Sequence, residues 1–398
     1  MKKNIVTFVL LVATMKIWAI DRIVQENGPT GTFSSISAAI TASVDGDRII
    51  IHPKIGGNPY IEDLTINKAL EFLSAEDGNR YKIQGNVTIA AAVNRKVTII
   101  GAHLVAGNII ANGTGWPTTL NVMGCLLNGG DINASNQFKA AIVSNILENG
   151  SILLSHGNVI GNELKTETKS IFISNSTSVS NDTMSIIGNK TPRITCTSDI
   201  FLNIINNFIA RVNSTTTNFF SIHYTFSSSL YKLKIINNTI ITPRSNSTST
   251  VFSDNTYLWL ESFATIKNNI FQFSTPNGSV NRANTFNVVG FSSSYNYYFT
   301  SNIRIANTST EVNLTDAPVT PTTGQLITST LAQNGADPSF EFYDLDLTVG
   351  DAGCYGGSYS LNNYFPITGS SRVYNIDMPF GITTTGAPLE IKADGFDR

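Results

Sequence analysis

The stretch Ile204-Ile205-Asn206-Asn207-Phe208-Ile209 returns later in the chain as Ile235-Ile236-Asn237-Asn238-Thr239-Ile240 and as Ile266-Lys267-Asn268-Asn269-Ile270-Phe271. Shorter versions occur at residues 145–150, 158–162 and 186–189. β-Branched residues favour strands, and asparagine tolerates the left-handed backbone of a tight bend. A short strand closed by such a bend, repeated many times, predicts a solenoid in which each coil covers its neighbour.

The spacing of the repeat favours coils made of strands. Seven aliphatic residues follow one another at gaps of 20 to 23 residues: Ile66, Ile89, Ile110, Ile132, Leu153, Ile173 and Ile194. Runs such as residues 169–174 and 231–235 alternate with the period of a strand, and no apolar face of helical period occurs between residues 82 and 305. We therefore expect Ile110, Ile132 and Leu153 to lie one above the next.

Composition excludes several classes of protein. The 398 residues are 41% hydrophobic but only 14% charged, and the net charge is −2. No basic surface is therefore expected, which argues against nucleic acid as a partner. The three cysteines lie far apart, so neither a zinc site nor a disulfide framework is predicted. They are expected to be small buried side chains, with a Cys125–Cys196 bridge as the alternative.

The N-terminus has the features of an export signal. Lys2 and Lys3 precede an apolar run from Ile5 to Met15, and Ala19 is a candidate cleavage position. The run is too short to span a bilayer, so residues 1–19 are interpreted as a cleaved signal peptide. We expect a secreted or cell-surface protein with no membrane span after signal removal.

A cap is expected directly after the signal. Phe33, Ile36, Ile40 and Val44 fall at helical spacing, and Ser34 or Ser35 can cap the N-terminus of that helix. An amphipathic helix is a suitable cover for the first coil of a solenoid, whose core would otherwise be exposed.

Three segments resemble known proteins. Residues 31–53, GTFSSISAAITASVDGDRIIIHP, followed by Tyr60-Ile61-Glu62-Asp63-Leu64-Thr65-Ile66, look like the first coil of right-handed parallel β-helix proteins of the pectin lyase-like superfamily, and are closest to pectinesterase-like members. The asparagine-rich repeats between Asn108 and Asn302 are similar to the generic repeats of that superfamily. Residues 337–357, which end in Asp351-Ala352-Gly353-Cys354-Tyr355-Gly356-Gly357, resemble the terminal coil of secreted bacterial members.

The resemblance implies an all-β chain. We expect a right-handed parallel β-helix over residues 20–358, with an N-terminal capping helix. Residues 359–398 are expected to form a short C-terminal β extension, with strands at 372–376 and 389–393.

Enzymes of this superfamily act on polysaccharides through paired carboxylates, or through an arginine or lysine base with Ca²⁺. Residues 101–300 hold eight carboxylates, none adjacent to another: Asp131, Glu148, Glu163, Glu167, Asp182, Asp199, Asp254 and Glu261. Asp182 with Asp199, or Glu148 with Glu167, could still meet across coils. Asp344 and Asp346 belong to the segment that resembles a terminal coil, which implies a structural role.

One fragment, Ser155-His156-Gly157, looks a little like a segment of polygalacturonases, but the companion motifs of those enzymes are missing, so His156 is expected to be a turn residue. His52, His103 and His223 are isolated in the sequence. The sequence therefore predicts no catalytic residue, no cofactor and no metal site.

The asparagines and aromatic residues allow two interpretations each. Asn207, Asn238 and Asn269 are expected to hydrogen-bond one another across coils, with sugar binding as the alternative. Two aromatic clusters suit either core packing or a flat sugar-binding face: Phe219, Phe220, Tyr224 and Phe226, and Tyr295, Tyr297, Tyr298 and Phe299.

The leading functional hypothesis is an exported, non-catalytic protein that presents an elongated polar face to polysaccharide or to a protein partner. The first alternative is a polysaccharide lyase or glycoside hydrolase that acts on a pectin-like or other glycan. The second is a structural subunit that docks onto a surface protein through its C-terminal strand.

Overall fold

The computed structural model describes residues 19–76, 78–113, 118–174, 183–211, 220–242, 256–273, 285–299, 305–367, 371–377 and 392–397. The predicted signal peptide lies outside these residues except for Ala19. Among the described residues, no helix is long and apolar enough to cross a membrane.

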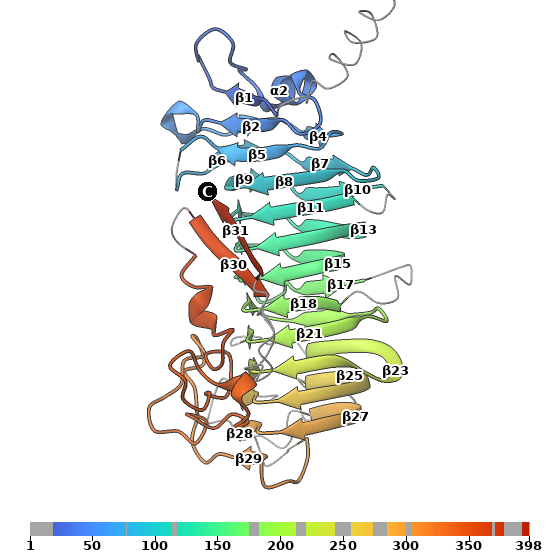
Figure 1. The fold of residues 1–398 in the computed structure, drawn as a ribbon, viewed down its shortest axis with the longest axis vertical. Helices are drawn as coiled ribbons and strands as arrows, with labels where there is room; N and C mark the ends of the chain where they lie inside the picture. Colours follow the sequence, from blue (N-terminus) through green and yellow to red (C-terminus); the bar gives the residue numbers. More distant parts are fainter. Residues whose placement is uncertain are drawn as a thin grey trace, which may run out of the picture.

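Parallel β-strands stacked along one long axis make up most of the molecule (Figure 1). Within the described residues, the larger sheet has 17 strands: β1 (Asp21–Val24), β2 (Arg48–Ile51), β4 (Leu64–Ile66), β5 (Glu71–Ser74), β7 (Val87–Ala90), β8 (Lys96–Ile100), β10 (Ile109–Asn112), β11 (Thr118–Met123), β13 (Ile132–Val143), β15 (Ile152–Ile160), β17 (Ile171–Ile173), β18 (Thr183–Ile187), β20 (Ile194–Cys196), β21 (Phe201–Ile205), β23 (Phe220–Ile236), β25 (Thr256–Lys267) and β27 (Thr285–Ser294).

The smaller sheet has 12 strands in the part of the chain that the structure describes: β3 (Tyr60–Ile61), β6 (Tyr81–Gln84), β9 (Ala102–Ala106), β12 (Leu126–Leu127), β14 (Ile146–Leu147), β16 (Glu163–Leu164), β19 (Lys190–Thr191), β22 (Phe208–Ala210), β24 (Thr239–Thr242), β26 (Ile270–Phe273), β28 (Tyr297–Phe299) and β29 (Val312–Asn313). Its strands follow one another in chain order, while the chain visits the larger sheet between them. This arrangement is consistent with a parallel β-helix-like fold.

The core is a column of aliphatic side chains that lie in register between the sheets. The column consists of Leu64, Val87, Ile109, Ile132, Ile152, Ile171, Ile194, Ile222 and Leu258. Each of these side chains is at most 2% exposed. Burying one aliphatic side chain of this size contributes about 1.5–3 kcal/mol, so the column is a principal source of stability.

The predicted column of Ile110, Ile132 and Leu153 is wrong by one residue at two positions. Ile132 is in the buried column, but Ile110 and Leu153 both pair with Asn133 and are half-buried on the outer side of the sheet. Side chains alternate between the two faces of a strand, so a shift of one residue moves a side chain from the core to the outside.

The predicted capping helix is confirmed as α2 (Ile36–Ala42). The Ser35 side chain accepts a hydrogen bond from the Ala38 N–H at 3.2 Å, and Ile36, Ala39 and Ile40 are buried. Val44, expected on the same apolar face, lies beyond the helix and is 45% exposed.

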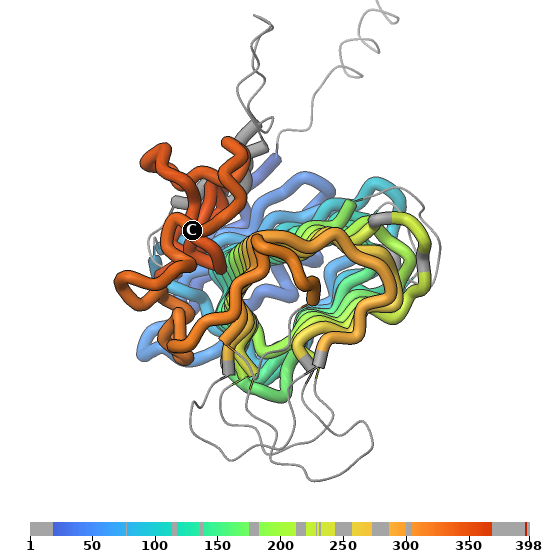
Figure 2. The backbone as a smooth tube through the Cα atoms, turned by 90° about the horizontal axis from the view of Figure 1, so that it is seen from below, coloured from blue at the N-terminus to red at the C-terminus, as the bar shows by residue number. Residues whose placement is uncertain are grey.

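After β29 the chain turns back along the stack (Figure 1) and lies on one side of it (Figure 2). We call residues 337–365 the strap; it includes the short 3-10 helices Phe340–Phe342 and Leu361–Asn363. The Asp337 N–H donates to Asn268 Oδ1 at 2.9 Å, while Tyr364, further along, packs against Ile187. The segment that resembles a terminal coil therefore lies beside earlier rungs of the stack.

The C-terminal extension forms a separate two-stranded sheet. β30 (Ser371–Asp377) pairs antiparallel with β31 (Lys392–Asp397). The strand predicted at 389–393 lies partly outside the described residues. Docking of this extension onto a surface protein stays a prediction.

Candidate functional site

A ladder of asparagine side chains follows the bend between the two sheets. Its members are Asn145, Asn162, Asn189, Asn207, Asn238, Asn269 and Asn296. The Nδ2 group of each donates to the Oδ1 atom of the next at 2.9–3.1 Å, and all seven side chains are buried. The predicted hydrogen bonding of Asn207, Asn238 and Asn269 is thereby confirmed.

The residue before each ladder asparagine makes the bend. Asn206, Asn237 and Asn268 have φ angles of 52°, 53° and 56°, and the corresponding Gly161 and Gly188 have φ angles of 65° and 62°. This left-handed region favours glycine and asparagine. The two residues of the repeated Asn-Asn pair therefore have different roles: the first bends the chain, and the side chain of the second is hydrogen-bonded to the next rung.

The ladder ends on a buried carboxylate. Glu311, which is 2% exposed, accepts hydrogen bonds from Asn296 Nδ2 at 3.0 Å, from Ser293 Oγ at 2.6 Å and from the Tyr298 hydroxyl. Burial, and then the charge of Glu311, raise the pKa of Tyr298 far above its usual range. These contacts assign Glu311 a structural role.

The outer face of β20, β23 and β25 carries an aromatic cluster. Thr195, His223 and Trp259 are direct neighbours across these parallel strands. The Phe220 ring lies 4.7 Å from the His223 ring and 5.2 Å from the Trp259 ring, between centroids. We call Phe220, His223 and Trp259 the ring patch.

Charged groups border the ring patch. The pKa of His223 is lowered by burial and by the positive charge of Arg193, while Glu261 opposes both effects. Burial also lowers the pKa of Arg193 itself. Trp259 Nε1 donates to Glu261 Oε1 at 3.3 Å, which fixes the indole beside the carboxylate. The site thus combines flat rings, a guanidinium and one carboxylate.

A buried hydroxyl adjoins the patch without a partner. Thr195 is 5% exposed, and no hydrogen-bond partner of its Oγ1 atom occurs among the described residues. A buried hydroxyl without a partner is destabilising, unless a water or a ligand supplies the missing bond.

Three of the four carboxylates considered as pairs in the sequence interact with basic side chains. Glu148 pairs with Lys165 at 2.7 Å and Asp199 pairs with Lys232 at 2.5 Å, whereas Asp182 lies outside the described residues. The pKa of Arg211 is lowered from its usual value, mainly by burial, and the negative charge of Glu167 partly opposes this shift.

Asp344 is hydrogen-bonded to backbone groups of the strap. Its two carboxylate oxygens accept hydrogen bonds from the N–H groups of Gly357 and Asp351, which fold the strap on itself. The described ranges contain no group of three or more His, Cys, Asp or Glu side chains that could hold a metal ion.

Two expectations for single residues had different outcomes. His156 is 1% exposed and lies inside β15, so its assignment as a turn residue is wrong. Cys125, Cys196 and Cys354 are buried free thiols, as expected, and the alternative Cys125–Cys196 bridge is absent.

The aromatic clusters of the sequence divide between core and surface. Tyr224, Tyr297 and Tyr298 are buried, whereas Phe226 is 40% exposed and Phe219 lies outside the described residues. His223, Trp259 and Arg193 were not recognised as a group, because loops of unequal length separate them in sequence. A local pattern could have identified two of them: His223 and Trp259 each lie between two strand residues that are buried, which places their side chains on the outer face.

Comparison of the chain with known protein families, with curated proteins and with solved structures found no match.

Proposed function

We propose that this chain is an exported right-handed parallel β-helix of the pectin lyase-like type that binds polysaccharide without cleaving it, at the cell surface or in the matrix. The observation that carries the proposal is the ring patch on the outer face of β20, β23 and β25. The apolar faces of sugar rings stack on aromatic side chains of this kind.

The geometry of the stack supports an extended ligand. Neighbouring strands of a sheet lie about 4.8 Å apart, so a polymer that follows the long axis meets a new rung at short, regular intervals. On the outer side, Leu153, Phe172, Thr195, His223 and Trp259 form one continuous row in register. Its half-buried members, Leu153, Phe172, His223 and Trp259, would contact several sugar units of one chain, whereas Thr195 is buried between them.

The charges favour an acidic polysaccharide. The positive charge of Arg193 acts on His223 within the patch, and a guanidinium binds carboxylates through two parallel hydrogen bonds. Glu261 is held by Trp259 and would instead accept a hydrogen bond from a sugar hydroxyl.

A glycan array followed by affinity measurement tests the proposal. We expect uronate-containing chains to bind, and Trp259→Ala to weaken their binding by about tenfold or more, as for aromatic residues at binding hot spots. The matched control is Phe291→Ala, which removes a surface ring that is 39% exposed and lies on β27, outside the patch. Equal affinity of Trp259→Ala and the wild type would show that the ring patch does not bind the polysaccharide, and would contradict the proposal.

The second candidate function is a polysaccharide lyase or glycoside hydrolase. It is favoured by two arginines, Arg193 and Arg211, whose pKa values are lowered by burial. Two carboxylates interact electrostatically with groups of the same region: Glu167 with Arg211, and Glu261 with His223. Incubation with uronic-acid and neutral polysaccharides distinguishes the two functions: release of unsaturated products or new reducing ends that Arg193→Lys abolishes would establish the enzyme.

A further inference from the structure

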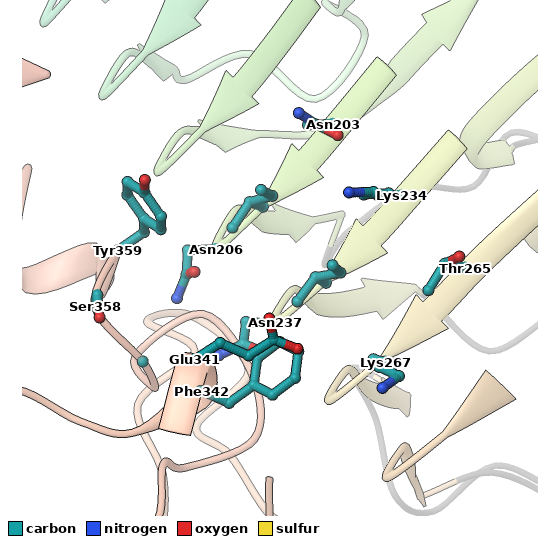
Figure 3. A pocket seen from close by; sticks show the side chains of 13 residues that line it. Asn203, Asn206, Lys234, Asn237, Thr265, Lys267, Glu341, Phe342, Ser358 and Tyr359 are labelled. Atoms are coloured by element: carbon teal, nitrogen blue, oxygen red, sulfur yellow. The ribbon is translucent and has the colours of Figure 1, made fainter. Parts of the chain in front are cut away.

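A small cleft lies between the strap and the outer side of the stack, and none of its lining residues belongs to the ring patch. It has a volume of about 230 Å³. Ile205 and Ile236 contribute aliphatic side chains from the ends of β21 and β23, and Phe342 and Tyr359 contribute aromatic rings from the strap (Figure 3). The cleft is thus lined by apolar groups on both sides, and its size suits a single ring with its substituents.

Three equivalent asparagines at the bends show why the cleft is unusual. Asn206 Nδ2 donates to strap carbonyl groups, at 3.2 Å to Cys354 and 2.6 Å to Gly356. Asn268 Oδ1 accepts the N–H of Asp337. The strap is therefore fastened at the rungs on either side of Asn237.

The middle asparagine has an acceptor without a partner. Asn237 lines the cleft and is 2% exposed, and its Oδ1 atom has no hydrogen-bond partner among the described residues. A buried amide oxygen is costly when it makes no hydrogen bond. A ligand in the cleft that donates a hydrogen bond would satisfy it.

The charged residues of the cleft indicate which second group such a ligand would carry, besides its hydrogen-bond donor. Lys234 is exposed on β23, points toward the cleft in Figure 3, and has no ion-pair partner in the described ranges. Lys267 is neutralised by Asp337 at 2.8 Å. Glu341 is an exposed residue of the lining. Lys234 is thus a cation available for an anionic group.

We propose that this cleft binds a small aromatic acid that carries a hydroxyl group, of the hydroxybenzoate or hydroxycinnamate class. The flat ring lies between the aliphatic side chains and the aromatic side chains, the carboxylate pairs with Lys234, and the hydroxyl donates to Asn237 Oδ1. A sugar acid fits less well, because its ring hydroxyls would lose their hydrogen bonds to water against Ile205 and Ile236. The inference uses none of the residues of the ring patch and is independent of the proposed function.

Calorimetric titration of the full chain with para-hydroxybenzoate and para-coumarate tests the proposal. Three analogues each lack one recognised feature: benzoate has no hydroxyl, para-hydroxybenzyl alcohol has no charge, and glucuronate has no aromatic ring. We expect at least one of the two hydroxy acids to bind, and benzoate and the alcohol to bind about tenfold more weakly or worse, since each leaves a buried or charged group of the site unpaired. Glucuronate should not bind.

Two variants locate the binding. Asn237→Gly removes the amide and preserves the bend, because glycine occupies the corresponding positions at Gly161 and Gly188. Lys234→Gln removes the charge, and Lys232→Gln is the matched control, since Lys232 pairs with Asp199 and does not line the cleft. Both cleft variants should lose affinity for the hydroxy acid, while the control retains it and all three keep the wild-type melting temperature.

Several results would overturn the inference. These are no heat of binding with either hydroxy acid, glucuronate binding as tightly as the hydroxy acids, unchanged affinity in both cleft variants, or a crystal structure with the hydroxy acid in which Asn237 Oδ1 is bonded to an ordered water alone.

Discussion

The bend beside the amide ladder and the outer face of β20, β23 and β25 belong to the same rungs, yet they differ in how far they repeat. At the bend, the same residue type recurs from Asn145 to Asn296, because every rung must make the same turn and the same hydrogen bond to the next. On the outer face, Thr195, His223 and Trp259 differ from rung to rung. Repetition therefore marks the scaffold, and the departure from repetition marks the candidate site.

The largest effect should come from breaking the ladder. Asn238→Ala removes the acceptor of the Asn207 N–H at 2.9 Å and leaves the Ile204 carbonyl without its side-chain donor. Asn207 Nδ2 is not left unpaired, because it keeps the Ile186 and Ile205 carbonyls as acceptors. Since each buried polar group left unpaired costs about 1–3 kcal/mol, we expect a loss of about 4 kcal/mol in the free energy of unfolding.

Chemical denaturation measures this loss. The control is Asn237→Gly, one residue earlier, which should change the free energy of unfolding by less than about 1 kcal/mol because glycine suits a left-handed bend. Equal losses in the two variants would show that the ladder does not hold the rungs together.

The next effect tests the register of the core. Ile152 is in the buried column, whereas Leu153 faces outward. We expect Ile152→Ala to cost about 3 kcal/mol, as for other large-to-small substitutions in cores, and Leu153→Ala about 1 kcal/mol. Thermal and chemical unfolding of the two variants measure these losses. A larger loss for Leu153→Ala than for Ile152→Ala would contradict the observed register and support the column of Ile110, Ile132 and Leu153 that the sequence predicted.

A smaller effect is expected at the end of the ladder. Glu311→Gln keeps an oxygen acceptor for Asn296 Nδ2 but removes the negative charge. Hydrogen bonds to a charged acceptor are about twice as strong as neutral ones, so we expect a loss of about 1 kcal/mol in unfolding free energy at neutral pH. A gain in stability would mean that burying the charge costs more than its three hydrogen bonds return.

The smallest expected effect is a pH dependence of binding at the ring patch. The pKa of His223 is lowered from 6.5 by burial and by Arg193, so the imidazole is neutral at pH 7 and gains a proton only as the pH falls below 6.5. Affinity for an acidic polysaccharide should therefore rise about two- to fivefold on acidification, as a charge-assisted contact forms.

Neutral glycans provide the control for this dependence. They should show no such rise, and His223→Gln should abolish it for acidic chains. An affinity that falls on acidification would place the histidine away from the anionic groups of the ligand.

Part of the architecture follows from the sequence in physical terms. The Asn-Asn pairs predicted both the bends and the ladder, since few residues tolerate a left-handed backbone and buried amides require partners. The capping helix was also predictable from local chemistry: Ser35 caps its N-terminus, and the spacing of Ile36 and Ile40 places both on the buried face.

The register could not be predicted, because aliphatic residues occur in unbroken runs. Ile109 and Ile110 are adjacent, as are Ile152, Leu153 and Leu154, so alternation does not say which side chain faces inward. The pairing with Asn133 decides it, because the buried position goes to its neighbour Ile132.

The candidate sites depend on contacts that span the chain. The ring patch joins residues separated by loops of unequal length, and the cleft needs a strap that returns from Asp337 to lie beside Asn206 and Asn268. Neither leaves a motif with constant spacing, so only the folded arrangement reveals them.

Backbone hydrogen exchange at the ladder tests the central claim most directly. The N–H groups of Asn207, Asn238 and Asn269 each donate to a buried side-chain oxygen of the next rung, so we expect them to exchange only through global unfolding, as slowly as the core strands. Exchange at the rate of solvent-exposed bends would contradict the account, because it would mean that the rungs are not joined by their asparagines.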